Sequence, residues 1–502
     1  MPDLSWLAGL LLDSRNLAPE LLLVVFAFAV LGASFATTSR RALGWLAIAP
    51  VLVSMFLTAG MMGLLDLGAI GLSSFAGPVS VRAAGGALLI DPFSLFFKLV
   101  FLSVALLVLI SSLSFLNDRD RHVGEYYALI LIATSGMMTV ASASSLLTLF
   151  VGIELASIST YALAAFRKRD LRSSEAGLKY FIIGATSSAV LLYGLSILYG
   201  ISGTLDISQL SRKVGESAWE PATAVGLAMV IAGLGFKMAA VPFHMWAPDV
   251  YEGSPTPVSA LLAAGSKKMA FAAAFKVFLV GLVAAKADLA FALGVVSVLT
   301  MTVGNVVAIS QTSMKRMLAY SSIAQAGYIL IALAVGTWTA VAGGLLHVLT
   351  HALMKAGAFV AVAAVAHLLT SERLEDYRGL SRRAPLPALS MAVFLLSLAG
   401  IPPFAGFWSK FVLFSGAVEA GGWYVWLALA GVLNSALSLY YYARVIKYMY
   451  MDEPPAAAPA THPLPGPYAA VLLIATAAIV IIGIYPQPLI AAALGAAQAL
   501  VP

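Results

Sequence analysis

The sequence predicts an all-α polytopic membrane protein with about fourteen transmembrane helices. Of its 502 residues, 61% are hydrophobic and only 10% are charged, and the mean hydropathy is +0.95. Soluble domains carry about 25% charged residues, so this composition excludes a water-soluble globule. The chain contains no cysteine, which excludes disulfides and thiolate-bound iron–sulfur clusters within it.

Apolar runs of about 20 residues, long enough to cross roughly 30 Å of hydrocarbon, recur along the chain. Three lie near residues 19–38, 43–65 and 92–116. Five follow near 123–141, 144–165, 176–200, 222–246 and 257–284, and five more near 288–310, 316–336, 339–369, 386–417 and 423–450. The last lies near 467–490. We therefore expect four parts: N-terminal helices in 1–122, sets of five helices in 123–285 and 286–450, and a loop with a last helix in 451–502.

Basic residues are concentrated in alternate connections between these spans. Short connections rich in Lys and Arg stay on the cytoplasmic side of a membrane. One set of connections holds many of them, among them Arg40, Arg41, Arg167, Lys168, Arg169, Arg382 and Arg383. The other set holds only Arg15, Arg82, Arg212, Lys213 and Lys286. This asymmetry predicts that both termini lie on the outer side, and it accounts for the net charge of +6 without a nucleic-acid surface.

Two of the predicted spans are interrupted by proline in a similar way. The runs are K-M-A-A-V-P-F-H-M-W from Lys237 and I-P-P-F-A-G-F-W-S-K, which ends at Lys410. Proline removes a helical hydrogen bond and clashes with the preceding turn, so we predict breaks at Pro242 and at Pro402-Pro403. Backbone exposed at mid-depth is tolerated only where it is buried in protein or lines a wet cavity, and paired broken helices are typical of transport sites.

The two breaks fall in the fourth span of each five-helix set, which predicts an internal repeat. An odd number of helices per unit inverts the second unit relative to the first, so an axis in the membrane plane would relate them. Lys179 and Lys355 then occupy the third helix of each set. The predicted fold is therefore a pair of inverted five-helix repeats, each with a broken helix, between flanking helices.

Several charged residues lie deep in apolar stretches. Lys237, Lys267 and Lys410 share this environment with Glu154. A charged side chain at the centre of a membrane helix costs roughly 2.5–3.5 kcal/mol, so such residues mark ion pathways by default. For Lys98 and Lys276 we expect side chains that extend from helix ends to the membrane surface.

His347 and His351 lie at i and i+4, but no H-E-x-x-H motif or third ligand accompanies them, so we predict no metal site. No P-loop motif for ATP is present. The residues thus indicate a translocation path and contain no source of energy for it.

The run G-F-K-M-A-A-V-P-F-H-M-W-A-P-D-V-Y-E-G-S-P, from Gly235, resembles the antiporter-like subunits in the membrane arm of respiratory complex I. The segments H-A-L-M-K-A-G-A-F and I-P-P-F-A-G-F-W-S-K-F are similar to those of subunit N of the NADH-quinone oxidoreductase type. Subunit M usually has glutamate where Lys410 stands. The multi-subunit sodium/proton antiporters resemble the chain too.

The resemblance implies roles for particular residues in proton translocation. Glu154, in G-I-E-L-A-S, would be the carboxylate partner of Lys237. Lys267, in A-A-G-S-K-K, would connect this pair to the terminal amine of Lys410. The adjacent Lys268 points about 100° away on a helix, and it stays open as the alternative to Lys267. Lys179 is included in the pathway, and water would bridge the gaps with the help of His244, His347, His351 and Lys355.

The resemblance also implies a function and its partners. We expect a proton-translocating subunit of a redox-driven oxidoreductase, with no cofactor in this chain. Flavin, iron–sulfur clusters and a quinone-like acceptor are expected in partner subunits, and M-like and K-like subunits are expected as neighbours in the lipid bilayer. A prokaryotic cell membrane is the expected location. The alternative is a subunit of a multi-subunit sodium/proton antiporter, which would contain none of those redox groups.

Overall fold

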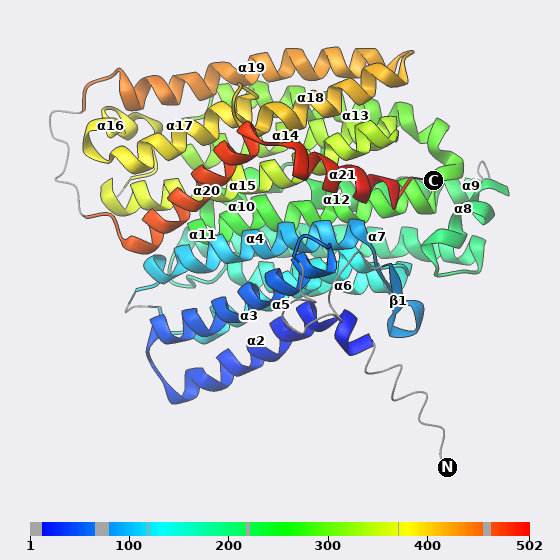
Figure 1. Cartoon of the computed structure of the whole chain (residues 1–502), viewed down its shortest axis with the longest axis horizontal. Helices are drawn as coiled ribbons and strands as arrows, with labels where there is room; N and C mark the ends of the chain where they lie inside the picture. The colour runs from blue at the N-terminus through cyan, green and yellow to red at the C-terminus, as the bar shows by residue number, and fades with distance from the viewer. Residues whose placement is uncertain are drawn as a thin grey trace.

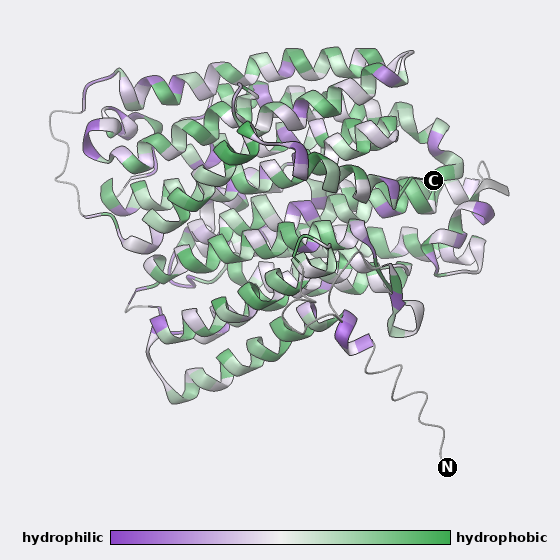
Figure 2. Ribbon diagram, viewed as in Figure 1, coloured by the Kyte–Doolittle hydropathy of each residue, from purple (hydrophilic) through white to green (hydrophobic). Residues whose placement is uncertain are grey.

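The computed structural model describes residues 13–65, 80–117, 120–216, 221–369, 371–454 and 463–501. It is a bundle of long helices that lie side by side (Figure 1). Within these residues, thirteen helices are long and apolar enough to cross a membrane. Hydrophobic residues cover most of their length, and many hydrophilic residues lie at helix ends and in connections (Figure 2). The structure confirms the helical membrane fold.

The N-terminal part contains α2 (Ala18–Ala36), α3 (Arg40–Met61) and α4 (Pro92–Phe115). An antiparallel hairpin precedes α4, with strands β1 (Val81–Ala83) and β2 (Leu88–Ile90) joined by η3 (Ala84–Gly86). Asp91 begins α4 because its carboxylate accepts a hydrogen bond of 2.8 Å from the Ser94 amide, and the Ser94 hydroxyl accepts one of 2.9 Å in return. This reciprocal cap satisfies two donors that a helix start otherwise leaves free.

The helices between residues 123 and 285 begin with α5 (Val123–Ser142), and the predicted spans among them correspond to more than five helical elements. This first five-helix region also contains α6 (Leu146–Ala164), α7 (Leu171–Ser202), α9 (Pro221–Met238), α10 (Trp246–Gly253), α11 (Thr256–Leu261) and α12 (Lys267–Lys276). A short helix that the sequence did not predict, α8 (Ile207–Glu216), precedes α9. The eighth predicted span is α11 and α12 joined by the π-helical turn η4 (Leu262–Ser266) and followed by a second π-helical turn, η5 (Val277–Gly281).

The second region follows η6 (Val283–Ala285). Its helices are α13 (Lys286–Ile309), α14 (Met314–Val335), α15 (Trp338–Leu369), α17 (Pro385–Ala399), α18 (Ala405–Ala420) and α19 (Tyr424–Tyr450). The short elements η7 (Leu374–Tyr377) and α16 (Leu380–Arg383) connect α15 to α17. The chain continues with α20 (Gly466–Ile484) and then α21 (Gln487–Gln498), a helix that the sequence analysis did not predict.

Both spans that the sequence predicts to break, at Pro242 and at Pro402-Pro403, are interrupted there. The helix pair α9 and α10 is separated between Met238 and Trp246, and α17 and α18 are separated between Ala399 and Ala405. The twelfth span, predicted as one run, is therefore two helices that are each too short to be counted among the thirteen. The third helix packs on the fourth in both regions, α7 on α9 and α15 on α18. This correspondence is consistent with the predicted repeats.

The core lies along three central elements. The span Thr256–Gly281 is fully buried within the protein, and α14 and α15 are buried along most of their length. α15 also contacts α4, from the N-terminal part of the chain, and α20 and α21, from the C-terminal part. The centre of the bundle is therefore protein-lined rather than lipid-lined, and it contains polar side chains that lipid would not solvate.

Candidate functional site

The first charged pair lies between α6 and the end of α9. The Nζ atom of Lys237 is 3.6 Å from Oε1 of Glu154. The same amine donates to the hydroxyls of Ser157, at 2.7 Å, and Tyr161, at 3.1 Å. Ser188 on α7 donates a hydrogen bond of 2.6 Å to the Glu154 carboxylate. Lys237 is buried, whereas 22% of the Glu154 side chain is exposed, so the carboxylate can face a neighbouring molecule while it holds the amine.

The interruption after α9 places Lys237 in the last turn of a helix that ends inside the bundle. The carbonyl end of a helix carries a partial negative charge, which favours a cation there. Ala239 has a left-handed φ of 53° directly after this turn, an uncommon conformation for a residue with a side chain. Trp246 closes the interruption by donating a hydrogen bond of 3.0 Å from its indole to the Phe236 carbonyl.

Lys267 and Lys268 are both buried, and they meet different partners. Lys267 donates a hydrogen bond of 3.1 Å to Ser322 on α14, and its amine lies 5.6 Å from the centre of the Tyr251 ring. Lys268 is hydrogen-bonded to Nδ1 of His351 on α15. The motif register selects Lys267, but the structure gives the adjacent amine of Lys268 a polar partner as well. These two amines begin a row of buried amines and imidazoles.

Two histidines on α15 continue this row. The rings of His351 and His347 are stacked with centroids 6.0 Å apart. His347 is hydrogen-bonded through Nε2 to the Gln325 amide oxygen at 2.8 Å and through Nδ1 to the Ser409 hydroxyl at 2.9 Å. Gln325 in turn donates to the Leu398 carbonyl at 3.1 Å. The i, i+4 spacing thus aligns both rings along one helix face.

Lys410 ends the row at the second interruption. Its amine donates to the carbonyls of Leu398, at 2.8 Å, and Ala399, at 3.3 Å, and to the Ser435 hydroxyl at 2.7 Å. The last carbonyls of a helix lack partners within it, and the break after Ala399 exposes those of α17 at mid-bundle. The Leu398 carbonyl is the same atom that accepts from Gln325, so backbone and side chains connect His347 to Lys410.

The comparisons with known proteins agree with this geometry. Residues 143–438 match the family described as NADH:quinone oxidoreductase/Mrp antiporter, TM. The chain is 50% identical to F(420)H(2) dehydrogenase subunit N of Methanosarcina mazei, an alignment that covers 97% of this chain and 99% of the relative. This chain belongs to the NADH:quinone oxidoreductase/Mrp antiporter family.

Further relatives give the type of subunit within the NADH:quinone oxidoreductase/Mrp antiporter family. NADH-quinone oxidoreductase subunit N of Heliobacterium modesticaldum is 46% identical over 82% of this chain and 86% of its own length. A chain of respiratory complex I from Thermus thermophilus has a TM-score of 0.76 and 32% identity, with 94% of this chain and 98% of that chain covered. A chain of the Mrp complex from Dietzia has a TM-score of 0.82 at 23% identity, over 98% and 97% of the two chains, and shares the fold. The chain is therefore an antiporter-like membrane subunit of the subunit N type.

Lys355 and Lys179, the amines predicted to correspond in the two regions, have different surroundings in this family member. Lys355 is fully buried and donates to the Leu318 carbonyl at 2.8 Å and the Ser321 hydroxyl at 2.7 Å. The Lys179 side chain is 41% exposed and is paired with Glu175 at 2.7 Å and Asp249 at 3.0 Å. Lys179 therefore lies outside the buried row.

His244 lies in the interruption between α9 and α10 and is almost completely buried. Its Nδ1 atom has no hydrogen-bond partner among the described residues. Those residues also supply no hydrogen bond between Lys237 and Lys267, and no group of three possible metal ligands. Hydrogen bonds thus join Lys268 to His351 and His347 to Lys410, the two stacked rings lie between these segments, and the first pair stands apart.

The expectation for Lys98 and Lys276 was wrong. Lys98 is fully buried and forms an ion pair of 2.6 Å with Glu20 of α2, and Lys276 is buried and donates a hydrogen bond of 2.8 Å to the Ala143 carbonyl. Sequence position gives the depth of a lysine in a helix but does not give the helix that it faces. The acidic Glu20 at the start of an apolar span was the available signal for the first pair.

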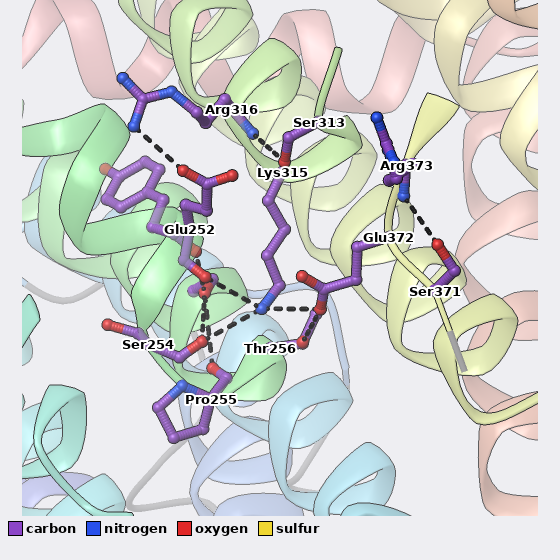
Figure 3. Close-up of polar contacts among 12 residues, drawn as sticks. Glu252, Ser254, Pro255, Thr256, Ser313, Lys315, Arg316, Ser371, Glu372 and Arg373 are labelled. Carbon is purple, nitrogen blue, oxygen red and sulfur yellow. Dashed lines mark hydrogen bonds and ion pairs between the residues drawn. The ribbon is translucent and has the colours of Figure 1, made fainter. Parts of the chain in front are cut away.

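A cluster of ion pairs that the sequence analysis missed lies at the end of the bundle with the basic connections. Arg316 contacts Asp249 at 2.7 Å and Glu252 at 3.0 Å. Lys315 forms an ion pair of 2.9 Å with Glu372 (Figure 3). The adjacent K-R pair at the start of α14 was the signal in the sequence, but its acidic partners lie far away along the chain.

Proposed function

We propose that this chain is a proton-translocating membrane-arm subunit of a redox-driven, complex I-like oxidoreductase. The observation that supports this function best is the row of buried amines and imidazoles between the two interrupted helices. Each amine has hydrogen-bonding neighbours that can stabilise its charged form, yet each is removed from bulk water. A lysine in such a place can gain or lose a proton when a nearby charge changes, which an arginine cannot do.

The pair Glu154 and Lys237 would load the proton. At about 4 Å, two opposite charges interact by about 4 kcal/mol with an effective dielectric constant of 20. A movement of Glu154 toward a neighbouring subunit would remove this stabilisation, and the ammonium of Lys237 would then give up its proton. The partial exposure of Glu154 supports such a contact with a neighbour.

The proton would then pass through the central row. Lys267 and Lys268 are adjacent acceptors, and the hydrogen bond between Lys268 and His351 supports the second amine as the link to the histidines. His347 would pass the proton on to Lys410 through water, with Gln325 and Ser409 orienting its ring. Release would follow on the outer side. Water would bridge Lys237 to Lys267, with His244 beside the interruption, and Lys355 would support the row from α15.

The proposal includes the assembly around this chain. The redox groups, namely flavin, iron–sulfur clusters and a quinone-like acceptor, would reside in partner subunits, and this chain would have no redox centre of its own. M-like and K-like subunits would be its neighbours in a prokaryotic cell membrane, with both termini on the outer side. The regions 123–285 and 286–450 would be inverted repeats that each supply one half of the path, flanked by 1–122 and 451–502.

Isolation of the native complex tests the choice between the two candidate functions. If the chain works in an oxidoreductase, the purified assembly contains flavin and iron–sulfur signals, and addition of its electron donor to sealed vesicles drives proton movement. A complete assembly that exchanges sodium for protons and lacks those signals would instead establish the antiporter. The Mrp chain supports that alternative through the fold alone.

A further inference from the structure

A cavity of about 830 Å³ lies between the two five-helix regions, at the end of the bundle that carries the basic connections. Its lining includes Glu252, Ser254 and Thr256 from the first region and Lys315 and Glu372 from the second. In Figure 3, the Lys315 side chain extends from α14 to an amine that lies between Glu372 on one side and Ser254 on the other. The cavity therefore gives access to a contact between the two regions.

Lys315 is a buried residue in the lining of this cavity. It is 4% exposed, and its amine donates to the carbonyls of Glu252, at 3.3 Å, and Ser254, at 3.2 Å. Among the described residues, Glu372 is the carboxylate within ion-pair distance, at 2.9 Å. The Glu252 carboxylate is instead bound to Arg316. A buried ammonium with one carboxylate partner depends strongly on that partner's charge.

Glu372 faces both the cavity and the buried amine. Its side chain is 30% exposed, and its carboxylate accepts a hydrogen bond of 3.5 Å from the Thr256 hydroxyl. The backbone of Glu372 is fixed to the start of α14 because its carbonyl accepts a hydrogen bond of 3.0 Å from the Met314 amide. The carboxylate can therefore exchange a proton with cavity water without moving its main chain.

Polar groups continue from Lys315 toward Lys267. The Ser259 hydroxyl donates to the Tyr251 carbonyl at 2.7 Å and lies 3.4 Å from the Ser254 carbonyl that accepts from Lys315. The Tyr251 ring lies beside the Lys267 amine. The hydroxyls of Tyr251 and Ser254 are buried without a partner among the described residues, and buried polar groups of this kind are typically satisfied by ordered water.

α14 carries both ends of this polar segment. Lys315 and Ser322 are seven residues apart, which places them on one helix face about 10.5 Å apart along the axis. Ser322 accepts the hydrogen bond from Lys267. The cavity, the ion pair and the central amine are thus arranged in sequence along one side of a single buried helix.

We propose that Glu372 and Lys315 form the proton entrance that supplies Lys267 from the cavity. This inference rests on the proposed function and adds an uptake step to it: protons that enter through Glu372 refill Lys267, and the transfer from Lys237 drives them on to Lys410, so both sites are needed for pumping. Hydronium in the cavity would give its proton to the Glu372 carboxylate, which becomes a neutral acid and loses its attraction to the Lys315 ammonium. The proton would pass through water beside the unpartnered hydroxyls of Ser254 and Tyr251 to the neutral amine of Lys267. Glu372 would return to carboxylate and pair with Lys315 again.

The test uses the whole complex in inside-out vesicles, with electron donor added and the membrane potential followed with a dye. Glu372→Gln keeps the size of the side chain and removes its proton exchange, so we expect the potential to build up at least about tenfold more slowly. Glu372→Asp, which is still an acid, retains a large part of the rate. Glu375→Gln is the matched control because Glu375 is exposed in η7, and it leaves the rate unchanged.

Formate added on the cavity side distinguishes a proton entrance from an ion pair that only holds the two regions together. A small weak acid can deliver protons in place of the missing carboxyl, so formate restores the rate of Glu372→Gln and has no effect on the unmodified complex or on Glu375→Gln. Full pumping by Glu372→Gln, or a loss that neither formate nor Glu372→Asp restores, would overturn the entrance while the proposed function stands. A redox-active unmodified complex that moves no protons would overturn the proposed function, and the entrance with it.

Discussion

Lys410 of α18 donates a hydrogen bond of 2.8 Å to the carbonyl of Leu398, on the opposite side of the Pro402-Pro403 interruption. The amine therefore binds an acceptor that exists because the preceding helix ends there. Lys237 has the related position in the last turn of α9. In both interrupted spans, the feature that breaks the helix also creates a favourable place for a buried cation.

The first prediction concerns the loading amine. Lys237→Ala should leave the complex assembled and lower redox-linked proton uptake by about 10²-fold or more, since it removes the titrating group. Lys237→Arg should fail nearly as badly because arginine keeps its proton. Proton uptake by sealed vesicles measures both. Lys168→Ala, which removes an amine from an exposed connection, serves as the control, and full pumping by the arginine variant would contradict a switching role.

A second prediction concerns the close approach of α18 to α17. A Cβ atom added at Gly406 would overlap the Ser397 carbonyl oxygen, so Gly406→Ala should destabilise the protein by about 1–3 kcal/mol or more. Gly495→Ala is the matched control, because no atom lies within 4 Å of its added Cβ and alanine favours a helix by up to about 1 kcal/mol. Thermal unfolding of the purified complex distinguishes them, and equal midpoints would contradict so close a contact between the two helices.

The third prediction concerns the ion pair of Lys98 and Glu20, which the proposed pathway does not use. Removal of one partner by Glu20→Leu leaves a buried ammonium and should cost about 3–5 kcal/mol of stability. The double variant Glu20→Leu/Lys98→Met should recover most of that stability and pump normally. Unfolding and vesicle pumping are measured on the single and double variants. A stable double variant that no longer pumps would show that the pair takes part in translocation.

The fourth prediction concerns acid sensitivity at the hairpin. Partial burial raises the pKa of Asp206, but hydrogen bonds from Ser208 and Arg82 outweigh it and hold the pKa of this carboxyl below its usual range. A lowered pKa contributes stability above the unfolded value of about 3.9, and this contribution is lost as the pH falls through the folded value. Asp206→Asn should therefore cost about 0.2–1 kcal/mol near pH 7 and little in acid.

Proteolysis of the segment near β1 as a function of pH measures this effect. The difference between the unmodified protein and Asp206→Asn should shrink steadily as the pH falls below about 4. Glu453→Gln, a substitution at an exposed position, is the control for general effects of charge. A difference that persists unchanged in acid would show that the Arg82 and Asp206 contact does not stabilise the hairpin.

The sequence was sufficient for features that depend on local composition. Apolar runs predicted the membrane spans, and prolines predicted the interruptions, because hydropathy and the geometry of proline both act within a single helix. Glu154 and Lys237 could also be paired through the family resemblance, and the structure places their charged atoms 3.6 Å apart.

Features that depend on contacts distant in the chain were not predicted. Lys98 and Glu20 belong to different helices, and so do Lys315 and Glu372. Helical periodicity could not identify those partners. The sequence analysis also included Lys179 in the translocation pathway, and the structure places its side chain beside Glu175 and Asp249, 41% exposed and apart from the buried row. The inverted relation of the two regions stays a prediction.

The π-helical turn η4 decides which of two adjacent lysines meets α14. A π-helical turn accommodates one more residue than an α-helical turn, and one residue corresponds to about 100° of rotation around the helix. An α-helical path through the same residues Leu262–Ser266 would therefore rotate α12 relative to α11 and bring Lys267 toward the position beside His351 that Lys268 now occupies. The widened turn thus sets the rotation of the whole following helix, and an α-helical turn of the same residues in its place would change the chemical neighbours of both amines at once.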